Sequence, residues 1–414
     1  MGGPLEGIRI IDMSSVMMGP YATQILADLG ADVIKIESPT GDSMRAVGPM
    51  VNPGMGSLYL HANRNKRSVV VDLKANGGRD IVLRLLEAAD VLVSNIRPQA
   101  MERLGLAYAD VARLNEKIIY AEAYGFGSGG LYSGKPAYDD LIQGLAALPS
   151  LGVRAGATEP RYAPSVIADR VVGLNIVNAV LAAVIHRQRT GEGQHIEVPM
   201  FETLTQLVLG DHMGGATFIP GQGPMGYSRL LSEHRRPYQT ADGYICVVVY
   251  TDEHWRAFFS LTGDEQLYSS DDRFFSLQKR TEHINELYDL VGQRLRKRTT
   301  AQWLECLDKA DIPAMPLHTP ESLLDDPHLR SVDFFYEMDH PTEGRLRQMR
   351  IPANWSTARR DHDMPAPRLG EHTSEVLKEF GFSNEQVGSF VSQGIIRQAD
   401  SLPSGISAIH QEIS

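Results

Sequence analysis

A carboxylate, Asp169, stands directly ahead of the most apolar stretch of the chain, which runs from Val171 to about Arg187. The stretch has almost no polar face, so it is predicted to be a helix buried in the core or in a subunit interface. By position alone, Asp169 would be the N-cap of this helix. The positive end of a helix dipole favours an ionised carboxylate, so we expect a lowered pKa for Asp169. Such a carboxylate could act as a nucleophile, and the helix N–H groups could stabilise an oxyanion.

Cations form a second group of residues that could do chemistry, because several lie near predicted strand ends or in loops. A local cluster of cations can bind an anionic ligand even in a chain whose net charge is −11. The alternative for any one of them is a solvated surface charge. The six candidates are Lys66, Arg67, Lys74, Arg97, Arg103 and Lys135.

Several common kinds of site are not supported by the motifs. The first predicted turn, Met13 to Gly19, lacks the GxGxxG spacing of nicotinamide-binding folds. Cys246 and Cys306 have no CxxC or His partner at metal spacing, so no metal site is expected. The glycine-rich segment 125–130 is either a flexible active-site loop or a plain turn. Its Ser128 is not a hydrolase elbow, because it is the fourth residue of the pentapeptide rather than the third.

Alternating strands and helices over the first 125 residues must position these side chains. Apolar strands are predicted at 8–12, 33–37, 69–71, 91–93 and 118–121, with helices between several of them. Strands this apolar are buried on both faces, which predicts a parallel sheet covered by helices on either side. Ligands of such sheets bind where loops leave the carboxyl ends of the strands.

Composition and length narrow the classes of protein. A chain of 414 residues suggests two or three domains. The acidic balance argues against a general nucleic-acid binder or membrane-surface binder. No apolar run is expected to reach the roughly 20 residues needed to span a bilayer, and the N-terminus lacks the pattern of a secretion signal. With two cysteines, a reduced cytoplasmic setting is expected.

Short segments along most of the chain resemble the class III CoA-transferase family, also called the CaiB/BaiF family. Each segment alone is weak evidence, but all of them occur in order between about residues 5 and 380, and they include LGADVIKIE at 29–37, RTGEGQ at 189–194 and LGEHT at 369–373. The complete set is 5–12 with Gly19-Pro20, 29–37, 65–68, 90–93, 189–194, 242–243, 339–341 and 369–373.

The resemblance implies an α/β fold: a large Rossmann-like domain with an inserted small α/β domain, in an interlocked homodimer. We therefore expect the N-terminal part of the large domain over 1–210, a linker over 211–231 and the small domain over 232–330. Residues 331–414 would form a further linker and return to the large domain. Unaided sequence reading could not have found this topology, because linked chains are rare.

The resemblance also implies the chemistry of Asp169, because family members carry a catalytic aspartate in a Pro…Asp-x-x-x-Gly pattern. Here that pattern is Pro164 to Gly173. The aspartate would attack the thioester of a donor acyl-CoA, form an aspartyl anhydride, and then become an aspartyl-CoA thioester. The acceptor acid would take the coenzyme A by the reverse steps. Coenzyme A is a substrate in this scheme, and no cofactor is expected.

Coenzyme A contacts follow by the same resemblance, because coenzyme A needs cations for its phosphates and an apolar slot for its adenine. Val16 and Val71 are expected to contribute backbone or apolar contacts. Asp139 is expected to support the acyl group or Asp169 by hydrogen bonding, with an ordinary surface acid as the alternative. The other expected contacts are Lys74, Asn95, Ile96, Arg103, Lys135 and Met200.

Two departures from the formyl-CoA transferases concern the acyl end. Those enzymes carry His and Gln in the first turn, where this chain has Ser15 and Met17. In place of their glycine run, the segment 227–238 contains Arg229, Arg235 and Arg236. Formate and oxalate are therefore expected to be poor substrates. The arginines hint at a dicarboxylic acid, although an ordinary charged linker explains them equally well.

Two competing functions are open. An α-methylacyl-CoA racemase shares the fold, but Tyr138 stands where the racemases carry their acid–base His. A phenol with a pKa of about 10 is a poor replacement for that His. The other alternative, a non-catalytic coenzyme A-binding subunit, is disfavoured because Asp169 is present. The expected partners are an acyl-CoA, a carboxylic acid and a second copy of the chain, with neither nucleic acid nor membrane.

Overall fold

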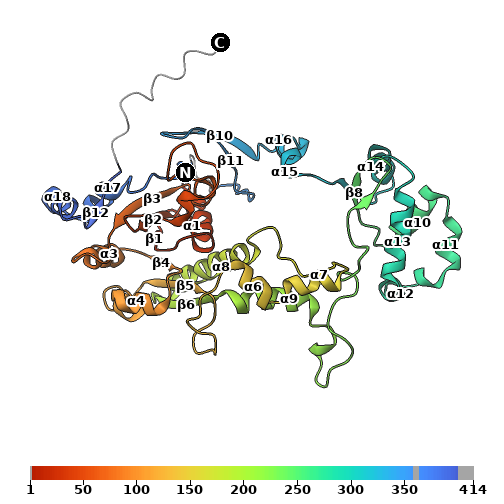
Figure 1. Cartoon of the computed structure of the whole chain (residues 1–414), viewed down its shortest axis with the longest axis horizontal. Helices are drawn as coiled ribbons and strands as arrows, with labels where there is room; N and C mark the ends of the chain where they lie inside the picture. The colour runs from red at the N-terminus through yellow and green to blue at the C-terminus, as the bar shows by residue number, and fades with distance from the viewer. Residues whose placement is uncertain (1, 358–362, 400–414) are drawn as a thin grey trace, which may run out of the picture. The chain divides into compact units, whose positions relative to one another are not determined.

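A seven-stranded sheet is the centre of the computed structural model, which describes residues 2–357 and 363–399. The strand order is β12-β3-β2-β1-β4-β5-β6, and all pairings are parallel except that of β12 with β3 (Figure 1). The strands are β1 (Arg9–Asp12), β2 (Asp32–Glu37), β3 (Lys66–Val71), β4 (Val91–Ser94), β5 (Ile119–Tyr124), β6 (Gln194–Pro199) and β12 (Ile396–Arg397). The order turns around between β1 and β4, which in open α/β sheets is where loops diverge and ligands bind.

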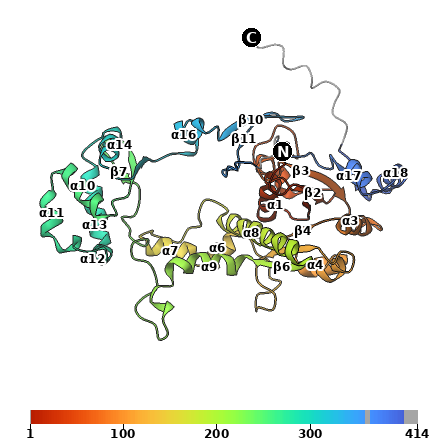
Figure 2. The same ribbon diagram turned by 180° about the vertical axis from the view of Figure 1, so that it is seen from behind.

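Helices cover both faces of this sheet, as the apolar strands predict. On one face, Ile81 and Leu85 of α3 (Gly78–Glu87) pack with Val69 of β3 and Val376 of α17 (Thr373–Glu379). Figures 1 and 2 both show α17 beside β3, and β12 pairs with β3, so the end of the described chain returns to the first sheet. On the other face lie α1 (Met18–Asp28) and the long α8 (Ile167–Thr190), which contact each other.

The chain divides into two compact units. The first contains 1–145, 164–205 and 331–414, and the second contains 146–163 and 206–330, as far as these residues are described. The remaining elements of the first unit are η1 (Ser43–Ala46), α2 (Ser57–Ala62), α4 (Pro98–Leu104), α5 (Tyr108–Ala112), α6 (Asp139–Leu145), the antiparallel pair β10 (Phe335–His340) and β11 (Gly344–Met349), and α18 (Asn384–Ser392).

The second unit has its own core, in which Trp255 and Trp303 are almost completely buried. Its antiparallel sheet joins β7 (Tyr238–Gln239), β8 (Tyr244–Val247) and β9 (Ala314–Pro316). Its helices are α7 (Leu148–Arg154), η2 (Gly214–Thr217), α10 (Asp252–Thr262), α11 (Glu265–Ser270), η3 (Asp272–Phe274), α12 (Leu277–Glu282), α13 (Ile284–Leu295), α14 (Thr300–Lys309), α15 (Pro320–Leu323) and α16 (Pro327–Ser331), whose last residue belongs to the first unit. Helix α9 (Met200–His212) begins in the first unit and ends in the second, so it extends two residues into the expected linker 211–231.

Helix α8 corrects one expectation from the sequence. It begins at Ile167, four residues before the apolar stretch, and is long and apolar enough to cross a membrane by length and composition alone. The statement that no apolar run approaches that length was therefore wrong. In the structure α8 packs against α1 and β5, and 44% of its most apolar window is buried. Packing of this kind also occurs in core helices of soluble proteins.

Candidate active site

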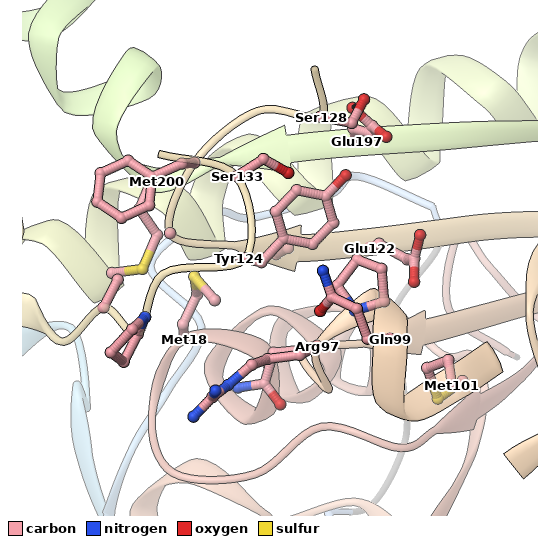
Figure 3. Close-up of a pocket in the computed structure, with 18 of the residues that line it drawn as sticks. Met18, Arg97, Gln99, Met101, Glu122, Tyr124, Ser128, Ser133, Glu197 and Met200 are labelled. Carbon is pink, nitrogen blue, oxygen red and sulfur yellow. Dashed lines mark hydrogen bonds between the residues drawn. The ribbon is translucent and has the colours of Figure 1, made fainter. Parts of the chain in front are cut away.

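A cavity of about 680 Å³ lies in the first unit, at the carboxyl ends of β1, β4, β5 and β6. Its wall includes the turn after β1, the start of α4, the segment from Glu122 to Phe126 and the end of β6 (Figure 3). Asp169 lines the same cavity. Cavities of this size commonly bind small molecules, and this one lies where the strand order places a ligand site.

Asp169 is the third residue of α8, and Val166 is the N-cap. The N-cap interpretation of Asp169 was therefore wrong. Its place is fixed by the next turn of the helix, because Gly173 lies against α1: an added Cβ would be 2.9 Å from Cδ1 of Tyr21 and 3.0 Å from the carbonyl oxygen of Met18. The Asp-x-x-x-Gly spacing thus brings α8 close to α1, and the carboxylate lies one turn above this contact.

Asp139 supports the start of α8. It is 8% exposed, so the alternative of an ordinary surface acid was wrong. Its Oδ1 accepts the backbone N–H of Asp169 at 2.9 Å, and its Oδ2 accepts Nε2 of Gln143 at 2.6 Å. The N–H of Asp169 is therefore occupied, and the N–H of Arg170 donates to the carbonyl of Val166 at 3.0 Å. Neither N–H group is available to an oxyanion.

The acidity of Asp169 differs in sign from our expectation. Burial raises its pKa, the nearby Asp139 carboxylate raises it further, and Arg170 only partly opposes them, so that the pKa is about 7. The expectation of a lowered pKa was wrong, because lost hydration and a like charge outweigh the helix dipole. Near neutral pH, Asp169 is therefore present in both its protonated and its ionised form, and the ionised form is an unusually basic carboxylate.

The six candidate cations fall into two groups according to their ion pairs. Lys66 is 1% exposed and lies 3.1 Å from Asp12, while Arg67 pairs with Asp32 at 2.7 Å. These two cations are structural, and their candidacy for ligand binding was wrong. A second group has no ion pair within residues 2–357 and 363–399: Lys74, Arg97, Arg103 and Lys135. The ammonium group of Lys135 lies over the ring of Tyr132, 4.4 Å from the ring centroid.

Comparison with known proteins gives this cavity its context. A profile of CoA-transferase family III matches residues 5–373. The chain belongs to CoA-transferase family III. Over 388 residues it is 32% identical to the succinate–glutarate CoA-transferase of Agrobacterium fabrum, covering 91% of this chain and 95% of that protein.

Two further relatives of this family III CoA-transferase bear on its function and fold. It is 32% identical to the acetyl-CoA:oxalate CoA-transferase of Acetobacter aceti, covering 91% of this chain and 96% of that protein. The crystal structure of a CaiB/BaiF family protein from Brucella suis superposes with a TM-score of 0.76 at 29% identity. That comparison covers 92% of this chain and all of the other, so the mostly parallel α/β architecture is that of the family.

The cavity brings together six of the ten residues that the resemblance assigns to the CoA-transferase site. These are Val16, Asn95, Lys135, Asp139, Asp169 and Met200. Lys74 and Arg103 are exposed outside the lining of this cavity. Ile96 packs partly buried against the core. Val71 is 1% exposed inside that core and its strand pairs with Ile396, so its side chain is not accessible to a ligand.

A polar wall of the family III cavity, on β5 and β6, was not predicted from the sequence. Glu122 is paired with His195, their Oε2 and Nε2 atoms lying 2.7 Å apart, and that hydrogen bond raises the pKa of His195. Ser128 donates to Glu197 at 2.7 Å (Figure 3), so segment 125–130 contributes to the cavity. Polar residues at alternate positions of otherwise apolar strands were the available signal, since they share one face.

Proposed function

We propose that this family III CoA-transferase moves coenzyme A from an acyl-CoA donor to a carboxylic acid, with Asp169 as the covalent nucleophile. The observation that carries the proposal is that Asp169 shares one cavity with Val16, Asn95, Lys135 and Met200. A partly buried carboxylate with a pKa of about 7 suits this role. Once ionised, it has little hydration to lose and is more basic than the acids whose thioesters it would attack.

The proposed reaction balances without a cofactor. An oxygen of Asp169 attacks the thioester carbonyl, the C–S bond breaks, and the thiolate of coenzyme A leaves an acyl–aspartyl anhydride. The thiolate then attacks the aspartyl carbonyl, which forms an aspartyl-CoA thioester and releases the donor carboxylate. The acceptor carboxylate attacks this thioester, and the thiolate returns to the acceptor's carbonyl to regenerate the Asp169 carboxylate. No step requires an oxidant or a net proton transfer.

The unpaired cations support the coenzyme A part of the proposal. Lys74, Arg97, Arg103 and Lys135 lie near the carboxyl edge of the sheet without a carboxylate partner among the described residues. Other surface cations do have partners, for example Arg84 with Glu87 at 2.7 Å. A phosphate or pyrophosphate would supply the missing negative charge. We therefore retain Lys74, Ile96 and Arg103 as proposed contacts outside the cavity itself, together with a backbone contact from Val71.

The acceptor that we propose is a dicarboxylate. Succinate, glutarate and oxalate, named in the two relatives above, are all dicarboxylates. The oxalate relative also weakens the expectation that oxalate is a poor substrate. In the second unit a separate cavity of about 390 Å³ is lined by Arg236 and Arg296, neither of which has an ion pair within the described residues. Two guanidinium groups without a carboxylate partner suit an anion, so we propose Arg236, one of the arginines that hint at a dicarboxylic acid, as a carboxylate-binding residue.

Arg236→Ala tests the dicarboxylate proposal. It should lower kcat/KM for glutarate relative to a monocarboxylate of the same chain length by about 10- to 150-fold, the usual value of one charged hydrogen bond. Arg235→Ala is the matched control, because this exposed neighbour does not line the cavity. Equal losses for both acids, or equal losses in both variants, would contradict a role in recognising the second carboxylate.

We propose that the active form is a homodimer, interlocked as the resemblance implies, with the small domain inserted in the large one and the enzyme in the cytoplasm. The support is an apolar surface on the first unit: Leu141 and Leu145 of α6 and Leu174 and Ile185 of α8 are each 46–51% exposed. Helices α6 and α8 contact each other, and large apolar side chains exposed on such a pair are usually covered by another chain. Light scattering should give twice the chain mass of 45.7 kDa, and a monomer at micromolar concentration would refute the dimer.

Covalent trapping tests the nucleophile. Incubation with acyl-CoA alone should load Asp169 with an acyl or CoA group. Hydroxylamine should then convert the side chain to a hydroxamate, and borohydride should reduce the thioester to an alcohol, both visible in the peptide mass. Asp169→Asn is the control and should give neither product. Rapid α-deuteration of the substrate with unmodified Asp169 would instead support a racemase. The absence of both Asp169 modification and α-deuteration would support a non-catalytic subunit.

The racemase alternative gains no support from the site. Tyr138 lines the cavity and is 70% exposed, and a phenol is a poor replacement for the acid–base His of a racemase. Racemisation needs an acid–base group on each face of the α-carbon. His195 also lines the cavity, but it is held by Glu122 at 2.7 Å. We therefore rank CoA transfer first.

A further inference from the structure

The turn after β1 has an unusual backbone. Val16, which lines the cavity, has a φ of +70°. Five of the described non-glycine residues have a positive φ. Val16 is one of the five, and it is the one of them with a β-branched side chain. This conformation costs of the order of 1–3 kcal/mol for such a residue, so surrounding contacts must hold it in place.

Side chains, rather than backbone ladders, supply those contacts. The N–H of Ser14 donates to Oδ1 of Asp12 at 2.9 Å, and its carbonyl accepts Nζ of Lys35 at 2.7 Å. Both backbone groups of Ser15 bond to the Asn95 side chain, at 2.9 and 2.8 Å. Five consecutive polar groups of the turn are thus bonded by side chains, the fifth being the N–H of Val16.

That fifth contact comes from a buried ion pair. The N–H of Val16 donates to Oδ1 of Asp42 at 3.1 Å. The other oxygen of Asp42 lies 3.0 Å from Nζ of Lys35, and the side chains of both residues are at most 1% exposed. Asp42 is itself fixed, because its backbone N–H donates to Glu37 at 3.0 Å. Neither Asp42 nor Lys35 lines the cavity.

We propose that Asp42 and Lys35 are positioning residues for the coenzyme A pocket: together they hold the turn Ser14–Val16 in its strained form and thereby set the shape of the cavity wall. A buried ion pair is a weak source of net stability, because desolvation offsets its attraction. It is well suited to fixing one geometry, since both charges must be satisfied at once. Without it, the turn would relax toward negative φ and withdraw Val16 from the pocket.

The consequence is a change in ligand binding rather than in the chemical step. The proposal rests on coenzyme A occupying this cavity, so the readout is the Kd of coenzyme A measured by calorimetry. Asp42→Ala removes both the ion pair and the acceptor for the N–H of Val16. Asp42→Asn removes the charge but keeps an acceptor oxygen of the same reach. The two variants therefore differ in the hydrogen bonds that Oδ1 of Asp42 accepts, from the N–H of Val16 at 3.1 Å and from the N–H of Met44 at 3.0 Å.

Val16→Gly provides the background in which Asp42→Ala is repeated. Glycine adopts positive φ without strain, so the turn no longer needs Asp42 to hold it. We expect Asp42→Ala to weaken coenzyme A binding about 5- to 150-fold, which is the strain of about 1–3 kcal/mol converted at 1.4 kcal/mol per tenfold. In the Val16→Gly background the same substitution should weaken it no more than about threefold, within ordinary additivity. Asp42→Asn, which loses the ion pair but keeps the acceptor, should lie between wild type and Asp42→Ala, and kcat at saturation should change little in the two Asp42 variants.

Each outcome decides a different question. If wild type does not bind coenzyme A, the proposed function fails. If wild type binds and Asp42→Ala binds equally well, the positioning role fails. If the loss is as large with Gly at position 16 as with Val, Asp42 acts only as a stabilising residue, and the proposal is again refuted. Circular dichroism checks folding, and Asp42→Ser, whose hydroxyl is too short to reach the turn, replaces Asp42→Ala if that variant does not fold.

Discussion

Replacing Asp139 by Asn tests how the site sets the acidity of Asp169. Asn keeps an oxygen that can accept the N–H of Asp169, now bonded at 2.9 Å, and it differs from Asp139 mainly in charge. Burial and the Asp139 charge both raise the pKa of Asp169, in that order, to about 7. The substitution therefore removes the second cause and leaves the first.

The expected size of the change follows from electrostatics. At about 6 Å, the outer limit at which neighbouring charges commonly shift a pKa, two unit charges interact by roughly 2–3 kcal/mol at an effective dielectric constant of about 20. That energy corresponds to about 2 pH units and is an upper bound, because water in the cavity and the Arg170 cation screen it. We expect the pKa of Asp169 to fall by about 1 unit. It should not return to 3.8, because burial remains the larger cause.

The assay is the pH dependence of kcat/KM at low acyl-CoA concentration. Only ionised Asp169 can attack, so activity should rise with pH through the pKa of the free enzyme, with a slope of +1 below it on logarithmic axes. Wild type should level off above about pH 7. Asp139→Asn should level off near pH 6, so its loss of activity should be smaller at pH 6 than at pH 8. The pH dependence of Asp169 loading by acyl-CoA should follow the same curve.

Two results would refute the reasoning. An acid limb that stays at pH 7 in Asp139→Asn would mean that the Asp139 charge does not control this ionisation. A limb that is unchanged when loading of Asp169 is measured directly, but shifts in turnover, would assign the limb to another group. Asp139→Ala is the control for the hydrogen bond. It removes the same charge as Asp139→Asn but also leaves the N–H of Asp169 without its acceptor.

Other predictions follow from the same geometry. Asp169→Asn should abolish transfer yet stabilise the fold by about 1–4 kcal/mol at pH 8, with no gain near pH 4. The reason is that a carboxyl with a raised pKa in the folded state lowers the free energy of unfolding as pH rises from about 4 to 7. Urea denaturation at both pH values measures this difference. Gly173→Ala should cost about 1–3 kcal/mol and reduce turnover, since the added Cβ meets α1, whereas Gly210→Ala on α9, with open space around it, should be neutral in thermal unfolding. Arg103→Ala or Lys135→Ala should raise KM about 10- to 150-fold, and equally for several acyl-CoA donors, if each binds a phosphate of coenzyme A.

Contrary outcomes are equally specific. Equal stabilities of wild type and Asp169→Asn at pH 8 would show that the carboxylate is not strained by burial. Normal turnover in Gly173→Ala would mean that the approach of α8 to α1 does not place Asp169. A KM effect confined to one donor would move Arg103 or Lys135 from the coenzyme A site to an acyl pocket.

The strands were predictable because their signal is local. Segments such as 69–71 and 91–93 are apolar throughout, as is typical of a strand that is buried on both faces. The start of α8 was placed four residues late, because its first turn, Ile167–Arg170, contains two charged residues. A helix end is set by capping and tertiary contacts as much as by composition, so sequence periodicity locates it poorly.

The sequence by itself determined the type of sheet, the family and the choice of Asp169, because motif order and residue type are properties of the chain. Only the tertiary structure decided which neighbours each group has. It brought Asp139 beside Asp169, although 30 residues separate them, and so reversed the expected pKa shift. It also buried Lys66 beside Asp12 and placed Asp42 against the backbone of Val16. Charge interactions and desolvation depend on distances and solvent exposure, and these exist only once the chain is folded.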